Sequence, residues 1–184
     1  SKLLQTNWTR RETWNRNYSE TRSPQIPSAI LELLSHQNFT DMRYAHDPLV
    51  KFHIARSIYK SLLRYVNFQH RITDVVVQPL PVKDIWANLD SKANRVTLGW
   101  TPMLDPLEPS AMPSQYIVYT KIGNRGFDSG QIVAEPSFTM AITPGVQYCF
   151  RVAALNDGGE SFPSEEMTVY KAPNEQKRVM IVNG

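Results

Sequence analysis

Glu32 stands in the middle of an apolar run, within the stretch PSAILELLSHQNFTD that covers residues 27–41. Its flanking aliphatic residues are Ile30, Leu31, Leu33 and Leu34. If Ser28 starts a helix, these side chains share one face and the Glu32 carboxylate points into water. If the run is a buried parallel strand, Glu32 lies near the rim of a sheet, where functional side chains gather. A carboxylate in such an apolar wall can act as a general base, so Glu32 is the first candidate for catalysis.

The four histidines are the candidates for metal chemistry. They are His36, His46, His53 and His70, separated by 10, 7 and 17 positions. A helical pair of zinc ligands needs a separation of four positions, and none of these gaps provides it. We therefore expect ordinary surface or packing histidines and no metal site built from them. His36 is close enough to Glu32 in sequence to border a site there.

Length and composition limit the class of protein. A chain of 184 residues with 41% hydrophobic residues fits one large domain or two small ones with a real core. The net charge of +3 is concentrated in residues 1–22, so we expect no broad phosphate-binding face and no nucleic-acid partner. Cys149 is the one cysteine, which excludes an internal disulfide. No apolar run reaches membrane-spanning length, so no membrane span is expected.

A helix follows the Glu32 region. Residues 47–66 are expected to be helical, because Asp47 can cap the helix and Pro48 suits its first position. Its apolar stripe recurs at steps of three and four: Ala55, Ile58, Tyr59, Leu62, Leu63 and Val66. For the first 26 residues, which are polar, helix and irregular coil both stay open.

From about residue 73 the apolar period changes to two, which is typical of half-buried strands. The alternating residues are Val96, Leu98 and Trp100, then Tyr116 and Val118, then Phe138, Met140 and Ile142, then Tyr148, Phe150, Val152 and Ala154. Turn signals separate these runs: MLDPLEPSAMP, KIGNRG, TPG and NDGG. Several short strands at this spacing predict an all-β sandwich.

Residues 77–172 resemble a fibronectin type III domain over their whole length. The matching segments are PLPVKDIWANL, NRVTLGWTP with Trp100 as core tryptophan, QYIVYTK, ITPGVQYCFRVAALNDGGESFPS and EMTVYKA. The resemblance implies that the Tyr148 hydroxyl bonds back to the backbone and forms a tyrosine corner. No Arg-Gly-Asp tripeptide occurs, so integrin-type adhesion is not expected.

Such sandwiches host many roles, and a spacer between two other domains is the role we expect here. The candidates for a ligand-binding patch are Trp86 and the long, proline-rich loop from Thr101 to Pro113. For Trp86 itself we expect a partly buried tryptophan on a strand.

Residues 20–66 resemble the C-terminal end of a zinc-dependent N-acetylmuramoyl-L-alanine amidase domain. The matching features are Glu32, Asn38, Asp41 and the helix that contains the Ile54-Ala55 pair. Ser35 and His36 depart from the family, which usually has an aromatic and an aliphatic residue between its Glu and Asn. The resemblance implies that Glu32 is a catalytic base facing a zinc ion, whose ligands, two His and one Glu, lie upstream of residue 1. This segment would hold no metal ligand and would be inactive alone.

These observations predict a mixed fold class: an N-terminal α/β remnant of one strand plus helices, then an all-β immunoglobulin-like sandwich of the fibronectin type III kind. The expected domains are 1–72, amidase-like; 73–174, fibronectin type III; and 175–184, a linker and the first strand of a further domain, from RVMIVNG. Because the chain has no initiator Met and no targeting segment, we expect an internal piece of a longer chain.

The predicted parent is a secreted, periplasmic or cell-surface multidomain bacterial protein that acts on the cell wall or on glycans. It would be a zinc amidase that hydrolyses the muramoyl-peptide amide bond, with peptidoglycan or another glycan as partner and with the sandwich as spacer or binding module. The alternative is a non-catalytic glycan- or protein-binding or spacer segment of a polysaccharide-degrading, xanthan-lyase-like protein.

Overall fold

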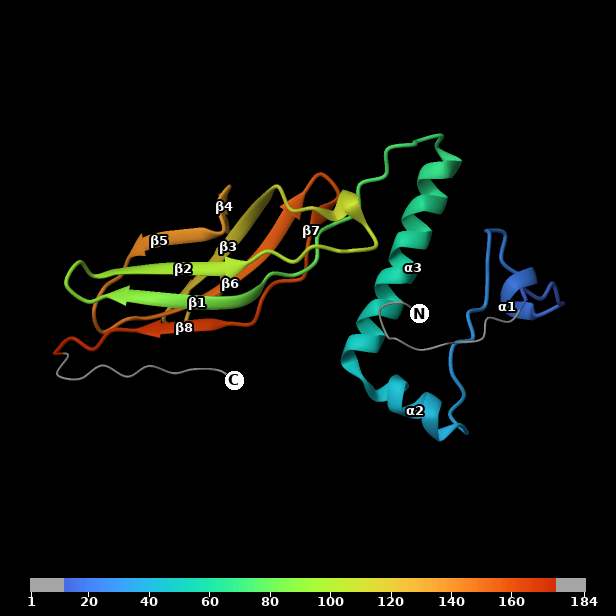
Figure 1. Cartoon of the computed structure of the whole chain (residues 1–184), viewed down its shortest axis with the longest axis horizontal. Helices are drawn as coiled ribbons and strands as arrows, with labels where there is room; N and C mark the ends of the chain where they lie inside the picture. Colours follow the sequence, from blue (N-terminus) through green and yellow to red (C-terminus); the bar gives the residue numbers. More distant parts are fainter. Residues whose placement is uncertain (1–11, 175–184) are drawn as a thin grey trace. The chain divides into compact units, whose positions relative to one another are not determined.

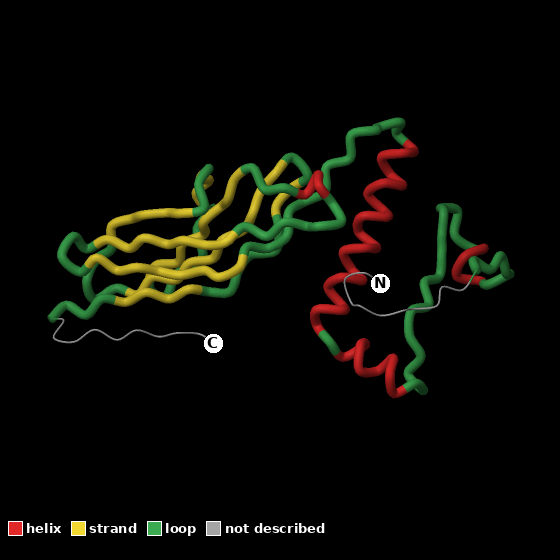
Figure 2. The backbone as a smooth tube through the Cα atoms, in the orientation of Figure 1, coloured by secondary structure: helices red, strands yellow, loops and turns green. Residues whose placement is uncertain are grey.

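The computed structural model of the chain describes residues 12–174, and the strand predicted within 175–184 lies outside the described residues. The chain divides into two compact units, Ser1–Leu62 and Leu63–Gly184, and each is described by itself. Figure 1 and Figure 2 show helices in the N-terminal part of the chain and strands in the C-terminal part. Among the described residues, no helix is both long and apolar enough to cross a membrane.

The regular secondary structure in the described N-terminal part of the chain consists of helices. Its helices are α1, Ser19–Arg22; α2, Phe39–His46; and α3, Pro48–Gln69, whose last turns belong to the second unit. The predicted helix over residues 47–66 is confirmed, and Asp47 caps it, because its Oδ1 accepts from the Leu49 N–H at 2.8 Å. Only Val50 and Arg56 are buried on α3, so most of its apolar stripe lies at the surface.

The strand predicted around Glu32 does not form, and this part of the prediction is wrong. Residues 23–38 contain neither helix nor strand, so the helical alternative fails as well. A buried parallel strand needs paired neighbours and cover on both faces, and the described part of the first unit contains no other strand. The run is therefore irregular, and its side chains are exposed except that of Leu34, which is half-buried. The first helix after it is α2, which starts where Asn38 Oδ1 accepts from the Thr40 N–H at 3.0 Å.

The second unit is a sandwich of two antiparallel sheets (Figure 1). The first sheet has the order β1-β2-β5, with β1 at Lys83–Asp90, β2 at Arg95–Thr101 and β5 at Ser137–Ala141. The second has the order β4-β3-β6-β7, with β8 also paired to β6: β3, Gln115–Ile122; β4, Gln131–Val133; β6, Gln147–Asn156; β7, Gly159–Glu160; β8, Met167–Tyr170. One 3-10 turn, η1 at Pro109–Ala111, lies in the loop between β2 and β3.

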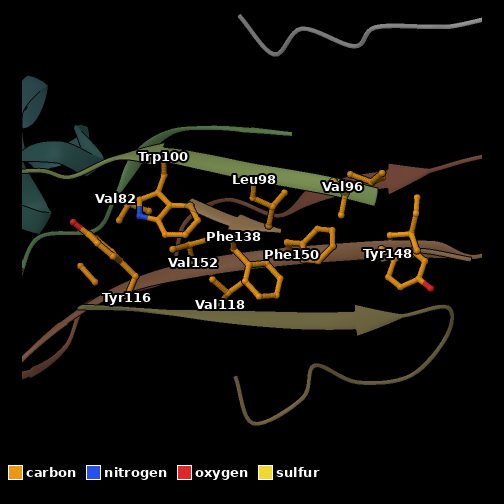
Figure 3. Packing of buried hydrophobic residues seen from close by; sticks show 13 residues of the cluster. Val82, Val96, Leu98, Trp100, Tyr116, Val118, Phe138, Tyr148, Phe150 and Val152 are labelled. Atoms are coloured by element: carbon orange, nitrogen blue, oxygen red, sulfur yellow. The ribbon is translucent and has the colours of Figure 1, made fainter. Parts of the chain in front are cut away.

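The core of the sandwich lies between the two sheets (Figure 3). Its buried members are Val82, Val96, Leu98, Trp100, Tyr116, Val118, Phe138, Ile142, Tyr148, Phe150, Val152, Ala154 and Val169. Trp100 packs edge-on against Tyr116, with ring centroids 5.3 Å apart. Nearly all these residues belong to the period-two pattern of the sequence, because successive strand residues face opposite sides of a sheet. The predicted mixed fold class is confirmed for the helices and for the all-β sandwich that follows them, and it is wrong for the one strand expected in the α/β remnant.

The tyrosine corner predicted at Tyr148 is also confirmed. The Tyr148 side chain is 4% exposed, and its hydroxyl oxygen accepts from the Thr143 N–H at 3.0 Å. Gly145 turns the chain between them with φ at +83°, in the left-handed region that favours glycine. The corner fixes the start of β6 to the turn that precedes it.

Candidate functional site

The structure places Glu32 on an exposed segment before α2. Asn38, which the amidase resemblance pairs with it, instead caps α2 through its side-chain oxygen. His36, His46 and His70 are exposed, and the ring of His53 packs edge-on against that of Phe52 at 5.8 Å. Within residues 12–174, no group of three or more His, Cys, Asp or Glu could hold a metal ion.

A buried carboxylate organises the end of the sandwich where the chain enters it. Glu108 is 5% exposed and precedes η1. Its Oε2 accepts from Arg64 Nη2 at 2.5 Å, and its Oε1 accepts from the Ser110 hydroxyl at 2.9 Å. The Ser110 oxygen in turn accepts from the Val77 N–H at 3.3 Å. All four residues belong to the second unit, so this network ties the last turns of α3 and the segment before β1 to the same loop.

Asn156 completes this entry network at the end of β6. Its Nδ2 donates to the carbonyl oxygens of Val77 at 3.0 Å, Ser110 at 3.1 Å and Met112 at 3.3 Å. Its Oδ1 accepts from the Gly158 N–H at 2.8 Å. Ser110 and Met112 belong to the long loop that the sequence singled out as a ligand-binding candidate. Part of that loop therefore serves to hold the incoming chain.

Glycine is required beside this network at Gly158. A Cβ atom there would lie 2.6 Å from the Val76 carbonyl oxygen and 2.7 Å from the Val77 carbonyl carbon. Backbone atoms cannot yield as a flexible side chain can, so any other residue would push the incoming segment away. We call Arg64, Val77, Glu108, Ser110 and Asn156 the entry clamp.

A second network holds the chain where it leaves the sandwich. Lys171 Nζ donates to the Ser91 carbonyl oxygen at 2.5 Å and also to Asn94 Oδ1. The Lys171 carbonyl oxygen accepts from the Gly145 N–H at 2.7 Å. Asn94 adopts φ of 52° and accepts from the Ile142 N–H through its own carbonyl at 2.8 Å. We call Lys171, Ser91 and Asn94 the exit clamp.

The two clamps lie at opposite ends of the sandwich. Val77 of the entry clamp precedes β1, whereas Ser91 and Asn94 of the exit clamp form the turn that follows β1. An eight-residue strand such as β1 spans about 25 Å. Figure 1 shows the chain entering the sandwich beside β7 and leaving it after β8 at the other end.

Trp86 lies on β1, on the outer face of the first sheet, and is 51% exposed. Its place on a strand agrees with the prediction, whereas its side chain is exposed and not the partly buried one that was expected. Its partner across the strands is Gly99. A Cβ atom on Gly99 would lie 2.1 Å from Trp86 Cζ2 and 2.8 Å from Nε1, so the indole rests directly on the glycine. One face of the ring is therefore covered, and the remainder is open to solvent.

The outer face of the second sheet carries charged and aromatic groups. The Tyr119 hydroxyl donates to Glu160 Oε1 at 2.7 Å. Burial and this hydrogen bond raise the pKa of Tyr119 to about 12, since both disfavour the phenolate beside a carboxylate. The Arg151 guanidinium lies 4.7 Å from the centre of the Phe127 ring and donates to Glu166 at 3.2 Å. These charged groups are therefore paired with neighbouring side chains of the same sheet.

The pKa of Glu166 lies below its ordinary value. The first cause is a hydrogen bond with the side chain of Cys149, followed by the positive charges of Lys121 and Arg151. Cys149 itself is 1% exposed and lies within 3.5 Å of the Thr168 hydroxyl. This cysteine is packed among its neighbours on the sheet and has none of the exposure of a reactive thiol.

The strand order of the two sheets and the Tyr148 corner define an immunoglobulin-like sandwich of the fibronectin type III kind. The comparison with protein-family models and with curated proteins finds no match.

Several solved structures are similar to the chain. One is the kinase region of twitchin from C. elegans, with 25% identity and a TM-score of 0.46, covering 55% of this chain and 18% of that one. Another is the fourth FNIII domain of a human protein, with 21% identity and a TM-score of 0.47, covering 58% of this chain and 90% of that one. A third is the FN5 domain of Drosophila Lar, with 19% identity and a TM-score of 0.40, covering 52% of this chain and 99% of that one. The chain thus spans less than two thirds of the twitchin structure.

Proposed function

We propose that the sandwich is a spacer module that holds the segments before and after it at a fixed separation within a multidomain protein. The observation that supports this function best is the pair of clamps at opposite ends of β1. A chain that enters and leaves at the same end brings its neighbours together, whereas this chain keeps them a strand length apart.

A spacer must also resist bending where the chain joins it. Flexible linkers behave as random coils, so a domain with loose ends fixes no distance. The entry clamp ties the segment before β1 through a buried carboxylate and a buried amide, and the exit clamp ties the segment after β8 through an ammonium group. Hydrogen bonds to charged groups are stronger than those between neutral groups. The Glu108 carboxylate and the Lys171 ammonium group therefore hold the entering and the leaving segments more firmly than neutral side chains would.

Backbone order parameters from ¹⁵N relaxation test this function on the full chain. In the unmodified protein we expect residues 70–76 to have order parameters of about 0.85, as in a rigid fold. Arg64→Ala leaves the buried Glu108 carboxylate without the guanidinium, and we expect the same residues to fall below about 0.6. Arg125→Ala, in an exposed turn, is the matched control and leaves them unchanged. Residues 70–76 that are already below about 0.6 in the unmodified chain would refute the spacer function.

Lys171→Met tests the other end in the same way. Methionine keeps much of the apolar stem but removes the ammonium group that binds Ser91 and Asn94. Residues 171–174 gain mobility on this substitution while residues 70–76 keep theirs. An unchanged order parameter at residues 171–174 would show that the ammonium does not fix the exit.

A finer proposal concerns the N-terminal part: a secreted or cell-surface parent that hydrolyses the muramoyl-peptide amide of peptidoglycan, with Glu32 as base and zinc as its metal. Its support is the ordered resemblance of Glu32, Asn38 and the Ile54-Ala55 helix, together with a helix, α3, at the expected place. The exposed position of Glu32 does not add to this support. Among the described residues no group of three or more His, Cys, Asp or Glu could hold a metal ion, and the resemblance itself implies that the zinc ligands lie upstream of them.

Zinc content and muropeptide release by the longer protein test the finer proposal. Glu32→Gln is expected to abolish release, with Glu20→Gln, in the exposed α1, as control. Undiminished muropeptide release by Glu32→Gln would refute the catalytic role of Glu32. A longer protein with neither zinc nor release would favour the alternative, a non-catalytic spacer or glycan-binding segment of a xanthan-lyase-like protein.

A further inference from the structure

The backbone of β1 is irregular at the point where Trp86 appears. The pairing of β1 with β2 shifts register between Lys83 and Trp86, and Asp84 between them adopts φ of 51°. A bulge of this kind redirects a side chain, and a non-glycine residue in the left-handed region is strained. Val82 and Ile85 both pack in the core although they are three positions apart, so the extra residue of the bulge keeps both on the core side of the sheet. The irregularity places Trp86 on the solvent side.

A second feature, independent of the bulge, prepares the same spot. Gly99 lies opposite Trp86 on β2, between the core residues Leu98 and Trp100. Glycine weakens a strand interior, and it often marks a close approach of another group. Here the group that approaches is the indole of Trp86, which occupies the space of the missing Cβ. The indole thus lies against the sheet with its opposite face available to a ligand.

The surroundings of the indole are polar and uncharged. The outward residues at its side are Asn88, Thr97, Ser137 and Thr139, which follow from the pairings of β1, β2 and β5. The hydroxyl groups of Thr97 and Thr139 lie 3.0 Å apart. Near the start of β1, Lys83 and Asp84 form an ion pair at 3.5 Å, so their charges balance. The outer face around Trp86 is therefore a neutral surface of one aromatic ring with hydroxyl and amide groups beside it.

We propose that this face, with Trp86 at its centre, binds a neutral sugar ring of a polysaccharide. The C–H face of a pyranose stacks on an indole, and hydroxyl and amide side chains both donate and accept, as sugar hydroxyls require. A peptide is a poorer occupant, because the backbone groups of β1, β2 and β5 point within the sheet and give it no main-chain partner on this face. A nucleic acid is a poorer occupant still, because the surface has no excess positive charge.

Titration of the full chain with cellohexaose and with chitohexaose tests the proposal. Tryptophan indole N–H resonances report binding, and the one lost in Trp86→Phe is that of Trp86. We expect this resonance to shift, with a dissociation constant in the millimolar range, typical of a single exposed stacking site. Trp86→Ala, followed through the backbone amide resonances of Asn88 and Thr97, weakens binding at least about tenfold. Tyr170→Ala, which removes an aromatic side chain that is 55% exposed on the other sheet, is the matched control and changes nothing.

Gly99→Ala keeps Trp86 in the chain but displaces its ring, since the new Cβ would overlap the indole. It weakens binding about as much as Trp86→Ala, provided that the core methyl resonances show an intact fold. An unshifted Trp86 resonance with both oligosaccharides, or equal binding by Trp86→Ala, would overturn the proposal. A shift with a proline-rich peptide and none with either sugar would overturn it too, in favour of a protein partner. These outcomes are independent of the spacer function, which the order parameters of residues 70–76 test.

Discussion

Asn156 allows a direct test of how the entry clamp is held, because one amide group donates to three carbonyl oxygens there. The substitution Asn156→Asp keeps the size of the side chain and the oxygen that accepts from the Gly158 N–H. It removes both N–H donors and adds a negative charge. The carbonyl oxygens of Val77, Ser110 and Met112 then lose a donor and face a carboxylate instead.

The magnitude follows from these contacts. The two N–H groups serve three acceptors, and each lost hydrogen bond lowers the free energy of unfolding by about 0.5–1.5 kcal/mol. With the carbonyl oxygens left unsatisfied, the total loss is about 3 kcal/mol. A buried carboxylate that faces carbonyl oxygens without a cation beside it adds to the loss at neutral pH. With an m-value of about 1.5 kcal/mol/M, a loss of about 3 kcal/mol lowers the urea midpoint by about 2 M. Asn156→Ala removes the same three contacts and the acceptor of the Gly158 N–H but adds no charge, so the pH-dependent part of its difference from Asn156→Asp reports the buried charge.

The pH dependence of Asn156→Asp has a definite sign. Burial among carbonyl oxygens raises the folded-state pKa of the introduced carboxyl above its unfolded value of about 3.9. Below its unfolded pKa such a group is protonated in both states and does not lower the free energy of unfolding. As pH rises from the unfolded pKa through the folded pKa, the free energy of unfolding falls. The difference in stability between Asn156→Asp and Asn156→Ala is therefore largest at neutral pH and shrinks as the solution is acidified.

Urea unfolding of the full chain, followed by tryptophan fluorescence at several pH values, measures both effects. Asn124→Asp is the matched control, because it adds the same charge in an exposed turn. If Asn156→Asp unfolded at the same urea concentration as Asn124→Asp, the amide would not hold the entry segment. A stability difference from Asn156→Ala that failed to shrink on acidification would refute the assignment of the extra loss to a buried charge.

Three further outcomes can be measured on the sandwich. Tyr148→Phe leaves the backbone N–H of the tyrosine corner without its acceptor and lowers the free energy of unfolding by about 1–3 kcal/mol; Tyr170→Phe, at an exposed position, serves as its control. Phe150→Ala opens a cavity at a side chain that is 0% exposed and costs about 3–5 kcal/mol in urea unfolding. In an ultraviolet titration, Tyr119 ionises at about 12, and Glu160→Gln brings its pKa part of the way back towards 10, because a neutral amide replaces the charged acceptor while burial remains. The stability linked to Tyr119 is present below its unfolded pKa and is lost as pH rises through its folded pKa.

The sandwich could be predicted from the sequence because its determinants are local. Val96, Leu98 and Trp100 recur at every second position of β2 and are all buried, so this pattern predicts both the strand and its buried face. The Pro-Gly turn before Tyr148 likewise places the corner within a few residues of its partner. The helix α3 was predictable for the same reason, since Asp47 and Pro48 stand directly at its start.

The clamps could not be predicted, because they join residues far apart in sequence. Arg64 and Glu108 are 44 positions apart, and Lys171 and Ser91 are 80 apart. No spacing rule connects such pairs until the fold brings them together. Gly99 gave a weak local signal, because a glycine inside an otherwise regular strand indicates a close approach, but the sequence does not say by which group.

The strand predicted around Glu32 was wrong because the local pattern was present but the rest of the sheet was not. Its apolar run satisfies the pattern of a buried strand, yet a strand of a parallel sheet exists only where neighbouring strands pair with it. The described part of the first unit has none, and Leu31 is 60% exposed as a result. Local pattern therefore decides strand formation only when the rest of the sheet is present in the same chain.

The spacer role and the sugar site use different surfaces of one sandwich, and this separation has a testable consequence. The clamps lie at its ends, whereas Trp86 lies on the outer face of β1. The hydrogen bonds of the two clamps do not include Trp86. A ligand on that face adds no contact to Glu108 or Lys171, so it need not alter the rigidity of either end. Trp86→Ala should therefore leave the order parameters of residues 70–76 unchanged, and Arg64→Ala should leave the oligosaccharide titration unchanged. If Trp86→Ala changed these order parameters, or Arg64→Ala changed the titration, the outer face and the ends of the sandwich would not act independently.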